Sequence, residues 1–327
     1  MKLKKTFITL GLLATLGLVG CSGDAEGESS SLDKVTLDYA YYSPTSLVLK
    51  EKGFAEEIFQ DEGIEVEWVL SQGSNKALEF LNSSSVDFGS TAGAAALMAK
   101  ANNAPVESVY LYSKPEWTAL VTNPDSGISS VEDLKGKKVA ATLGTDPYIF
   151  LVRALKDHGL STDDIELVNL QHPEGASALT NGNVDAWAGL DPHMARNELE
   201  GGAELFYRKP EFNTYGTLNV RSDYAKQHPE IVKQVIEAYE KAREWTVENP
   251  EKAAEILAEE AGLDLEVAKK SLERNDLSNP VPGEALRETV LGAGQVLQEE
   301  EVIKADVDIE KITEALINPQ YAEEVIK

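Results

Sequence analysis

The chain has 327 residues, of which 42% are apolar and 26% charged, with a formal net charge of −26. This length and composition are typical of a globular protein of two domains and exclude a disordered chain. The acidic charge argues against nucleic acid as a partner, because phosphate binding needs clustered Lys and Arg, and the single cysteine excludes an intramolecular disulfide.

Residues 1–20 have the pattern of a secretory signal peptide. Three lysines precede an apolar run at 7–19 that is too short for an ordinary membrane-spanning helix. The run ends in Leu18-Val19-Gly20-Cys21, which resembles the bacterial lipobox, so we expect cleavage before Cys21 and attachment of lipid to its thiol. The alternative is an ordinary signal followed by a stray cysteine. Residues 21–33 are then a flexible tether, and loss of the three lysines changes the net charge to −29.

The first part of the folded chain alternates strands and helices. Strands are predicted at 35–40, 65–70 and 86–88, each followed by a loop rich in Ser, Thr, Gly or Asn that opens a helix. Ser43 is a candidate N-cap, with Pro44 at the first helical position. The third strand is expected to end in a loop at 89–93 before a small-residue helix at 94–101, and strands follow at 106–112 and 118–122.

The same order repeats about 100 residues later. Val86-Asp87-Phe88 is matched by Val184-Asp185-Ala186 at an offset of 98, and Val35 by Val139 at an offset of 104. The repeat predicts an α/β protein with two similar β-α-β-α lobes. Ligands bind outside the carboxyl ends of strands in such open sheets, so we expect a cleft between the lobes.

The chain is expected to pass between the lobes twice. Strands at 118–122 and 215–221 would carry these crossings and form a hinge. We therefore assign residues 34–119 and 218–327 to lobe one and residues 120–217 to lobe two. The C-terminal part is predicted to be helical at 231–248, 251–260, from Asp264, at 284–298 and at 309–317. These helices should pack on lobe one; a separate helical third domain is the alternative.

The loops that open helices are the candidate binding residues. A helix N-terminus presents free N–H groups and partial positive charge, and it binds phosphate, sulfate or carboxylate groups without Arg or Lys. Ordinary helix capping is the alternative role for each Ser, Thr or Asn. The candidates from these loops are Ser43, Thr45, Ser46, Ser74, Asn75, Ser90, Thr91, Gly93, Gly144 and Thr145.

Aromatic and acidic residues flank the same loops. Tyr42, Trp117 and Tyr148 could form the wall of a pocket for an organic tail. Phe88 and Trp187 are more typical of core positions in buried strands. Asp146 and Asp191 are interpreted as caps, with pairing to an amine of a zwitterionic ligand as the alternative.

Signals for catalysis are weak. The segment 89–93 has the frame of a nucleophile elbow but carries Thr91 where serine is needed. The four histidines lack metal-ligand spacing, and His193 alone falls in an expected cleft loop. Walker and dinucleotide-binding sequences are absent. We therefore predict no catalytic residue, no metal and no cofactor.

The ordered motifs resemble the solute-binding lipoproteins of ABC importers for nitrate, sulfonates and taurine, and the sulfonate branch in particular. The resemblance covers roughly residues 35 to 321, and its motifs lie at 48–53, 63–68, 85–89, 130–140, 184–187, 191–192, 228–230 and 319–322. It implies a type II periplasmic-binding-protein fold, an extracytoplasmic, lipid-anchored and monomeric protein, and delivery of a small ligand to a membrane permease. It also implies anion binding by residues 43–46, 72–74, 90–93, 144–148 and 190–193, which adds Gln72 to the candidates.

The sequence departs from this family at three positions. Leu190 and His193 stand where sulfonate-type relatives often have aromatic residues, and Asp146 replaces a small polar residue. These departures leave room for taurine-like zwitterions beside plain alkanesulfonates. A heteroaromatic ligand such as a pyrimidine thiamine precursor is the alternative cargo. A cofactor-biosynthesis enzyme of the same fold is a third hypothesis, which the lack of cysteine beyond Cys21 and the export signal oppose.

Overall fold

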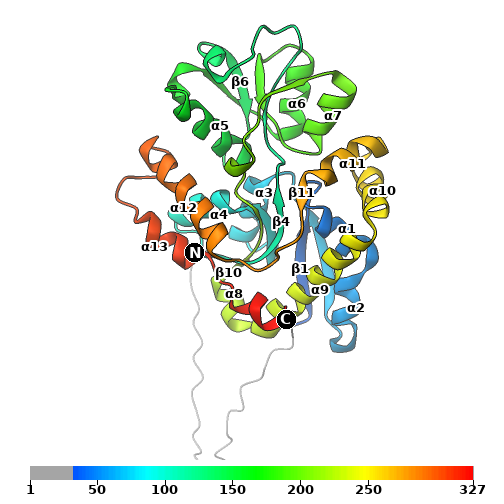
Figure 1. Ribbon diagram of the computed structural model, residues 1–327. Helices are drawn as coiled ribbons and strands as arrows, with labels where there is room; N and C mark the ends of the chain where they lie inside the picture. The colour runs from blue at the N-terminus through cyan, green and yellow to red at the C-terminus, as the bar shows by residue number, and fades with distance from the viewer. Residues whose placement is uncertain (1–31, 327) are drawn as a thin grey trace, which may run out of the picture. The chain divides into compact units, whose positions relative to one another are not determined.

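Residues 32–326 are described in the computed structural model, and their strands form two β-sheets (Figure 1). The predicted signal peptide, the lipobox with Cys21 and most of the predicted tether lie outside the described residues. None of the helices within 32–326 combines the length and apolar character that crossing a membrane requires.

The two sheets have the same underlying strand order. The first sheet consists, in spatial order, of β11 (Asn275–Asp276), β4 (Val106–Pro115), β10 (Gly216–Arg221), β3 (Phe88–Ala92), β1 (Lys34–Tyr39) and β2 (Glu65–Leu70). The second consists of β7 (Glu166–Asn169), β6 (Lys138–Ala141), β8 (Ala186–Ala188), β5 (Leu120–Thr122) and β9 (Glu204–Tyr207). In each sheet one strand, β1 or β6, lies between two parallel neighbours, and one of those neighbours, β3 or β8, has an antiparallel strand on its other side, β10 or β5. This matching order confirms the predicted repeat and the α/β fold class.

Two segments connect the sheets. The chain leaves β4 at Pro115 and enters β5 of the second sheet at Leu120; it returns between Tyr207 of β9 and Gly216 of β10. Arg208 and Glu116 join these two crossings by a paired ion contact, with N–O distances of 2.7 and 2.8 Å. The boundary assigned after residue 119 lies at the end of the first crossing, whereas the one after residue 217 falls inside β10.

The predicted loop at 89–93 was wrong, because most of it is strand β3. Residues 88–92 pair antiparallel with β10, from Gly216 opposite Ala92 to Val220 opposite Phe88. The small residues of β3 are of types that are common in loops, which led to the wrong prediction. They fit a central strand because α3 and α4 pack closely against it, and a Cβ added to Gly89 would lie 2.8 Å from Leu81.

Helices flank both sheets, and most of the predicted ones are present. They are α1 (Pro44–Lys52), α2 (Phe54–Phe59), α3 (Ser74–Asn82), α4 (Gly93–Ala101), α5 (Asp146–Asp157), α6 (His172–Thr180), α7 (His193–Gly201), α8 (Ser222–Gln227), α9 (Pro229–Glu248), α10 (Pro250–Ala261), α11 (Leu265–Glu273), α12 (Glu284–Glu299), α13 (Ile309–Leu316) and α14 (Gln320–Val325). Helices α2, α8 and α14 were not predicted. As expected, α9 and α10 contact α1, and α12 and α13 contact α4. Helices α11 and α12 also reach the second lobe, at α7 and α5.

Buried apolar side chains explain why these elements assemble. Leu37 and Phe88 are fully buried in the first sheet, and Trp187 is fully buried in the second, where it packs with Val121 and Met194. Helix α1 begins as predicted at Ser43 and Pro44, and it ends at Gly53, whose left-handed φ of 65° lets its N–H reach Leu49 O. Each strand therefore holds its following loop at the carboxyl edge of a rigid sheet.

Replacing Gly216 by alanine should destabilise the first sheet. A Cβ at this position would lie 2.2 Å from the ring of Tyr112, which is fully buried. Overpacking of this kind costs about 1–3 kcal/mol, so the free energy of unfolding in urea should fall by that amount. Gly292→Ala is the matched control, because nothing lies within 4 Å of its added Cβ in α12 and helix propensity favours alanine. Equal stability of the two variants would contradict this packing.

Candidate ligand-binding cleft

A small cavity lies where loops from the two sheets meet. Its volume is about 50 Å³, and its lining residues are Tyr41, Tyr42, Ser71, Gln72, Pro173, Leu190, Asp191, Pro192 and His193. These residues directly precede or begin α1, α3, α6 and α7. The cavity is therefore bordered by four helix N-termini, two from each lobe, which is the arrangement predicted for the cleft. Of the predicted site residues, Tyr42, Gln72, Asp191 and His193 line it.

The helix starts nearest the cavity are not capped by their own side chains. Ser43, Gly73 and Gln171 occupy the N-cap positions of α1, α3 and α6, and none of them makes a side-chain capping hydrogen bond. Thr145 at the start of α5 makes none either. Their first N–H groups keep their partial positive charge, which suits an anionic group.

Several buried hydroxyl groups near these starts have no hydrogen-bond partner. Ser43 and Ser90 are fully buried, Thr45 is fully buried and Ser71 is 1% exposed, and all four side-chain oxygens are unpartnered within residues 32–326. A buried polar group left without a partner costs about 1–3 kcal/mol. Ser71 lines the cavity and Ser43 directly follows the lining residue Tyr42, so these groups indicate a place where a guest molecule supplies the missing partners.

Other predicted hydroxyl residues already serve the protein. Ser46 accepts from Ala40 N–H at 3.1 Å, Ser74 accepts from Ala92 N–H at 3.0 Å, and Thr145 donates to Thr142 O at 2.7 Å. Thr91 belongs to an internal network with Thr217 and Asn219. These hydrogen bonds hold the loops in place, so the side chains position the loops of the cleft and are not free to bind a ligand themselves.

The start of α4 is occupied by the returning chain crossing. Gly93 N–H donates to Thr214 O and Tyr215 O, at 3.0 and 3.1 Å, and Ala94 N–H donates to the Thr214 hydroxyl at 3.0 Å. A Cβ on Gly93 would lie 2.6 Å from Thr214 O. Glycine is therefore required here for close packing of the hinge, and this helix start faces protein.

Asp146 is likewise surrounded by protein donors. Its carboxylate accepts from Trp117 Nε1 at 2.8 Å, from Thr214 N at 3.0 Å and from the Thr214 hydroxyl at 2.6 Å. Burial raises the pKa of Asp146, and these hydrogen bonds oppose that rise. Trp117 in turn packs edge-on against Tyr42, with ring centroids 5.9 Å apart. Asp146 thus fixes one aromatic residue behind the cavity wall.

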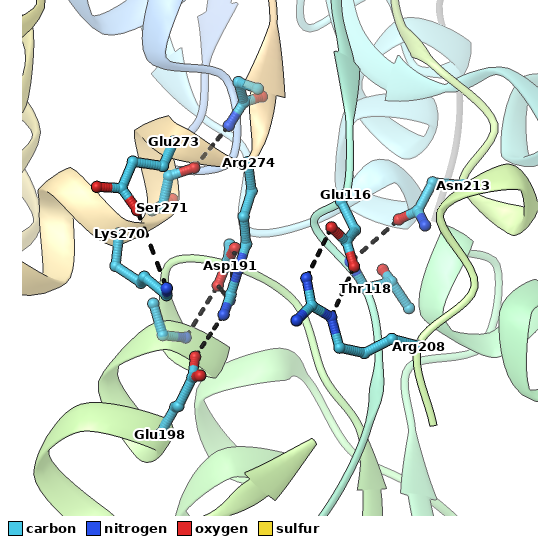
Figure 2. A network of polar contacts seen from close by, with 12 residues as sticks. Glu116, Thr118, Asp191, Glu198, Arg208, Asn213, Lys270, Ser271, Glu273 and Arg274 are labelled. Atoms are coloured by element: carbon cyan, nitrogen blue, oxygen red, sulfur yellow. Dashed lines mark hydrogen bonds and ion pairs between the residues drawn. The ribbon is translucent and has the colours of Figure 1, made fainter. Parts of the chain in front are cut away.

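A buried ion pair joins the two lobes at Asp191 (Figure 2). Arg274, at the end of α11, lies 3.1 and 3.2 Å from the two carboxylate oxygens of Asp191 and also contacts Glu198 of α7. Asp191 is 1% exposed, and it accepts from Ala195 N–H at 2.9 Å. Burial raises the pKa of Asp191 to about 6, although Arg274 favours its charged form. The arginine of lobe one therefore holds a cavity-lining residue of lobe two.

His172, which was not among the predicted site residues, lies where the two lobes meet, against Gly73. It is fully buried, and its Nδ1 lies 3.1 Å from the hydroxyl of Thr142, which itself donates to Leu170 O at 2.6 Å. Nδ1 must therefore carry the proton, and Nε2 is an acceptor without a partner within 32–326. A Cβ on Gly73 of lobe one would lie 2.9 Å from Nε2. Burial lowers the pKa of His172 to about 3, so the ring is neutral at physiological pH.

Two further predicted residues lie on the lobe-two side. Gly144 has a left-handed φ of 80°, and a Cβ there would lie 3.4 Å from the Asn75 side chain of lobe one. Tyr148 is 8% exposed in the first turn of α5. No cluster of three potential metal ligands occurs among residues 32–326. The side chains that meet at the cleft are therefore hydroxyl, aromatic, imidazole and carboxylate groups.

Asp38 is a second residue that sequence reasoning missed. It lies on β1, fully buried, and its Oδ1 accepts from Ser90 N–H at 2.8 Å while Oδ2 is unpartnered among the described residues. Burial raises its pKa to about 6, and the Ser90 backbone N–H and the neighbouring hydroxyls of Ser71 and Ser90 oppose that rise. An acid inside a predicted strand, between Leu37 and Tyr39, was the available sequence signal. Arg274, Ser71 and Gln171 carried no comparable signal.

Comparisons with known proteins agree with this geometry. The family model described as NMT1/THI5 like matches residues 44–253. A Bacillus subtilis (strain 168) protein provisionally named as aliphatic sulfonates-binding is 27% identical over 283 residues, covering 85% of each chain. The taurine-binding periplasmic protein of Escherichia coli (strain K12) is 28% identical over 252 residues, covering 73% of this chain and 72% of the relative.

A solved structure extends the comparison to the fold. The periplasmic aliphatic sulphonate binding protein of Escherichia coli has 26% sequence identity and a TM-score of 0.75, and the match covers 89% of this chain and 94% of that one. This likeness confirms the type II periplasmic-binding-protein fold, and the two relatives named above, which align along most of the chain, are binding proteins by name.

Asp38→Asn should change how stability depends on pH. The folded carboxyl titrates near 6, above the reference value of 3.8, so the folded state binds its proton more tightly. Wild-type stability from this group is greatest at low pH and is lost as pH rises through about 6. The stability gained on substitution should thus grow by about 2 kcal/mol between pH 4 and pH 7 in urea titrations. Asp125→Asn, on an exposed loop, is the control, and a pH-independent difference for Asp38→Asn would contradict the assignment.

Arg274→Gln should favour separation of the lobes. It leaves the buried carboxylate of Asp191 and the partly buried Glu198 without their counter-charge, and breaking a buried pair in this way costs several kcal/mol. We expect ligand affinity to fall about tenfold or more and the radius of gyration with saturating ligand to exceed that of the wild type in small-angle scattering. Arg287→Gln, whose partners Glu284, Glu310 and Glu314 are exposed residues of lobe one, should leave both unchanged. Wild-type affinity and scattering in Arg274→Gln would exclude a closing role.

Proposed function

The chain belongs to the NMT1/THI5-like family, and on that premise we propose that it binds a small organic sulfonate between its lobes and delivers it to the permease of an ABC importer. Its substrate-binding role follows from the sulfonate- and taurine-binding relatives that align along most of its length. The choice of sulfonate rests on the site, where neutral hydroxyl groups and helix N–H groups are available.

The observation that carries this proposal is the set of unpartnered hydroxyls beside uncapped helix starts. Ser43 exemplifies it: the residue occupies the N-cap of α1, yet its buried Oγ makes no hydrogen bond. A sulfonate offers three acceptor oxygens, which can accept from hydroxyl O–H and helix N–H groups at once. Hydrogen bonds to a charged group contribute more than neutral ones, about 1.5–3 kcal/mol each.

The proposed cellular setting includes a lipid anchor. The Leu18-Val19-Gly20-Cys21 sequence supports attachment to the outer face of the cell membrane, with the protein acting as a monomer beside its permease. A Cys21→Ser variant that stays in the membrane fraction of expressing cells would contradict the anchor.

Calorimetric titration of the purified mature protein with taurine, short alkanesulfonates and nitrate tests the ligand class. We expect saturable binding of at least one sulfonate, and Ser43→Ala should weaken it about tenfold because a charge-assisted hydrogen bond is lost. Ser83→Ala, which changes an exposed serine at the end of α3, is the matched control. No heat with any sulfonate would refute the proposed cargo.

A heteroaromatic ligand is the second candidate cargo. Tyr41 and Tyr42 line the cavity, and Trp117 packs edge-on behind Tyr42, so an aromatic wall is present. Stacking on such rings suits a pyrimidine. Competition of substituted pyrimidines with a bound sulfonate distinguishes the two ligand classes. If helix N–H groups bind the sulfonate anion, neutral pyrimidines should not displace it.

A further inference from the structure

Strands β1 and β3 separate at Asp38. β1 pairs with β2 from Lys34 to Tyr39 but with β3 only at Leu37 opposite Phe88. Beyond that pair, Ser90 N–H donates to the carboxylate of Asp38. The strand order β2-β1-β3 reverses direction here, and such a switch point is where open α/β sheets bind their ligands.

The carboxylate of Asp38 lacks a counter-charge. No ion pair within residues 32–326 involves Asp38, and its Oδ2 is buried without a hydrogen-bond partner. The hydroxyls of Ser71 and Ser90 lie beside the Asp38 carboxylate and favour its charged form. Neither is close enough and well enough aligned to form a hydrogen bond with a group in residues 32–326. An uncompensated buried charge is strongly destabilising, so this position is unfavourable unless something else pairs with it.

Two cavity-lining residues lie next to Asp38. Ser71 lines the cavity and contributes to the pKa of Asp38, and Tyr42 lines the cavity and has its own pKa raised by burial and by the Asp38 charge. The Tyr42 hydroxyl donates to Ser90 O at 2.9 Å, which leaves it unable to donate to Asp38. Asp38 therefore adjoins two of the residues that line the cavity.

The second lobe has a related arrangement at its own switch point. Val35 pairs with Val66 in the first sheet as Val139 pairs with Leu167 in the second, so Asp38 corresponds to Thr142 and Ser71 to His172. Thr142 and His172 are hydrogen-bonded, and they leave His172 Nε2 as a free acceptor. Both switch points thus present an acceptor that needs a donor, Oδ2 on one side and Nε2 on the other.

The other acids near the cavity are already paired. Asp146 accepts from Trp117 and Thr214, and Asp191 is held by Arg274. We propose that Asp38 determines specificity by pairing with an ammonium group of the ligand, so that the protein prefers an amino sulfonate to the same sulfonate without the amine. This inference rests on the proposed function. His172 Nε2 supplies a second acceptor for the same N–H donors.

The test compares taurine with ethanesulfonate, which differs by the amino group alone. Calorimetry on the wild type should show taurine binding at least about tenfold more tightly, as expected for one charge-assisted hydrogen bond. Asp38→Asn should abolish that preference and change the dissociation constant of ethanesulfonate little. Asp38→Ser, which keeps an acceptor for Ser90 N–H, serves as a second variant, and thermal melts verify that both fold.

Asp87→Asn is the matched control. Its carboxylate also accepts a backbone N–H between β1 and β3, from Thr36 at 2.9 Å, but at the amino end of β1. It should retain the preference for taurine. An unchanged preference in Asp38→Asn, or equal weakening of both ligands, would overturn the inference. Tight ethanesulfonate binding without any taurine preference in the wild type would overturn it while leaving the proposed function intact; binding of neither sulfonate would refute both.

Discussion

The central constraint on this structure is a set of buried hydroxyl groups near the cleft that have no hydrogen-bond partner within residues 32–326. Ser43, Thr45, Ser71 and Ser90 are buried at or beside the cleft, and within residues 32–326 their hydroxyls have no hydrogen-bond partner. An intramolecular hydrogen bond adds little net stability, but a buried group without one is costly. The cleft is therefore energetically incomplete by itself. A guest that supplies acceptors for these hydroxyls would stabilise the contact between lobes, which links ligand binding to closure.

In this acidic protein, an anionic ligand must be attracted by groups close to the cleft. With a net charge of −26, the long-range field repels anions, so attraction must come from groups within a few ångströms. Arg274 is the basic residue held at the cleft by Asp191, and it is used for the ion pair between the lobes. The anionic end of a ligand is left to helix starts and hydroxyl groups, whereas Asp38 and His172 offer acceptors for its other end.

The repeat explains why one ligand can meet two kinds of chemistry. Both sheets have a switch point, between β1 and β3 or between β6 and β8, and loops from both sheets line the same cavity. The backbone arrangement is shared, but the side chains have diverged. Lobe one has Asp38 and Ser71, and lobe two has Thr142 and His172 at the corresponding positions. A symmetric scaffold thereby recognises an asymmetric molecule.

The sequence by itself determined the two-lobe α/β fold, the two crossings and the loops that surround the cavity. The spacing of apolar residues predicts strands and helices from local sequence alone. The repeat, such as the offset between Val35 and Val139, is likewise visible in the sequence without coordinates. Tertiary structure alone decided which polar groups remain free. Asp146 and Asp191 were interpreted as caps, with pairing to a ligand amine as the alternative, but partners distant in sequence, Thr214 and Arg274, occupy them. Asp38 was left unpaired because β1 and β3 separate beside it, and such separation depends on strand pairing across 50 residues that no local pattern encodes.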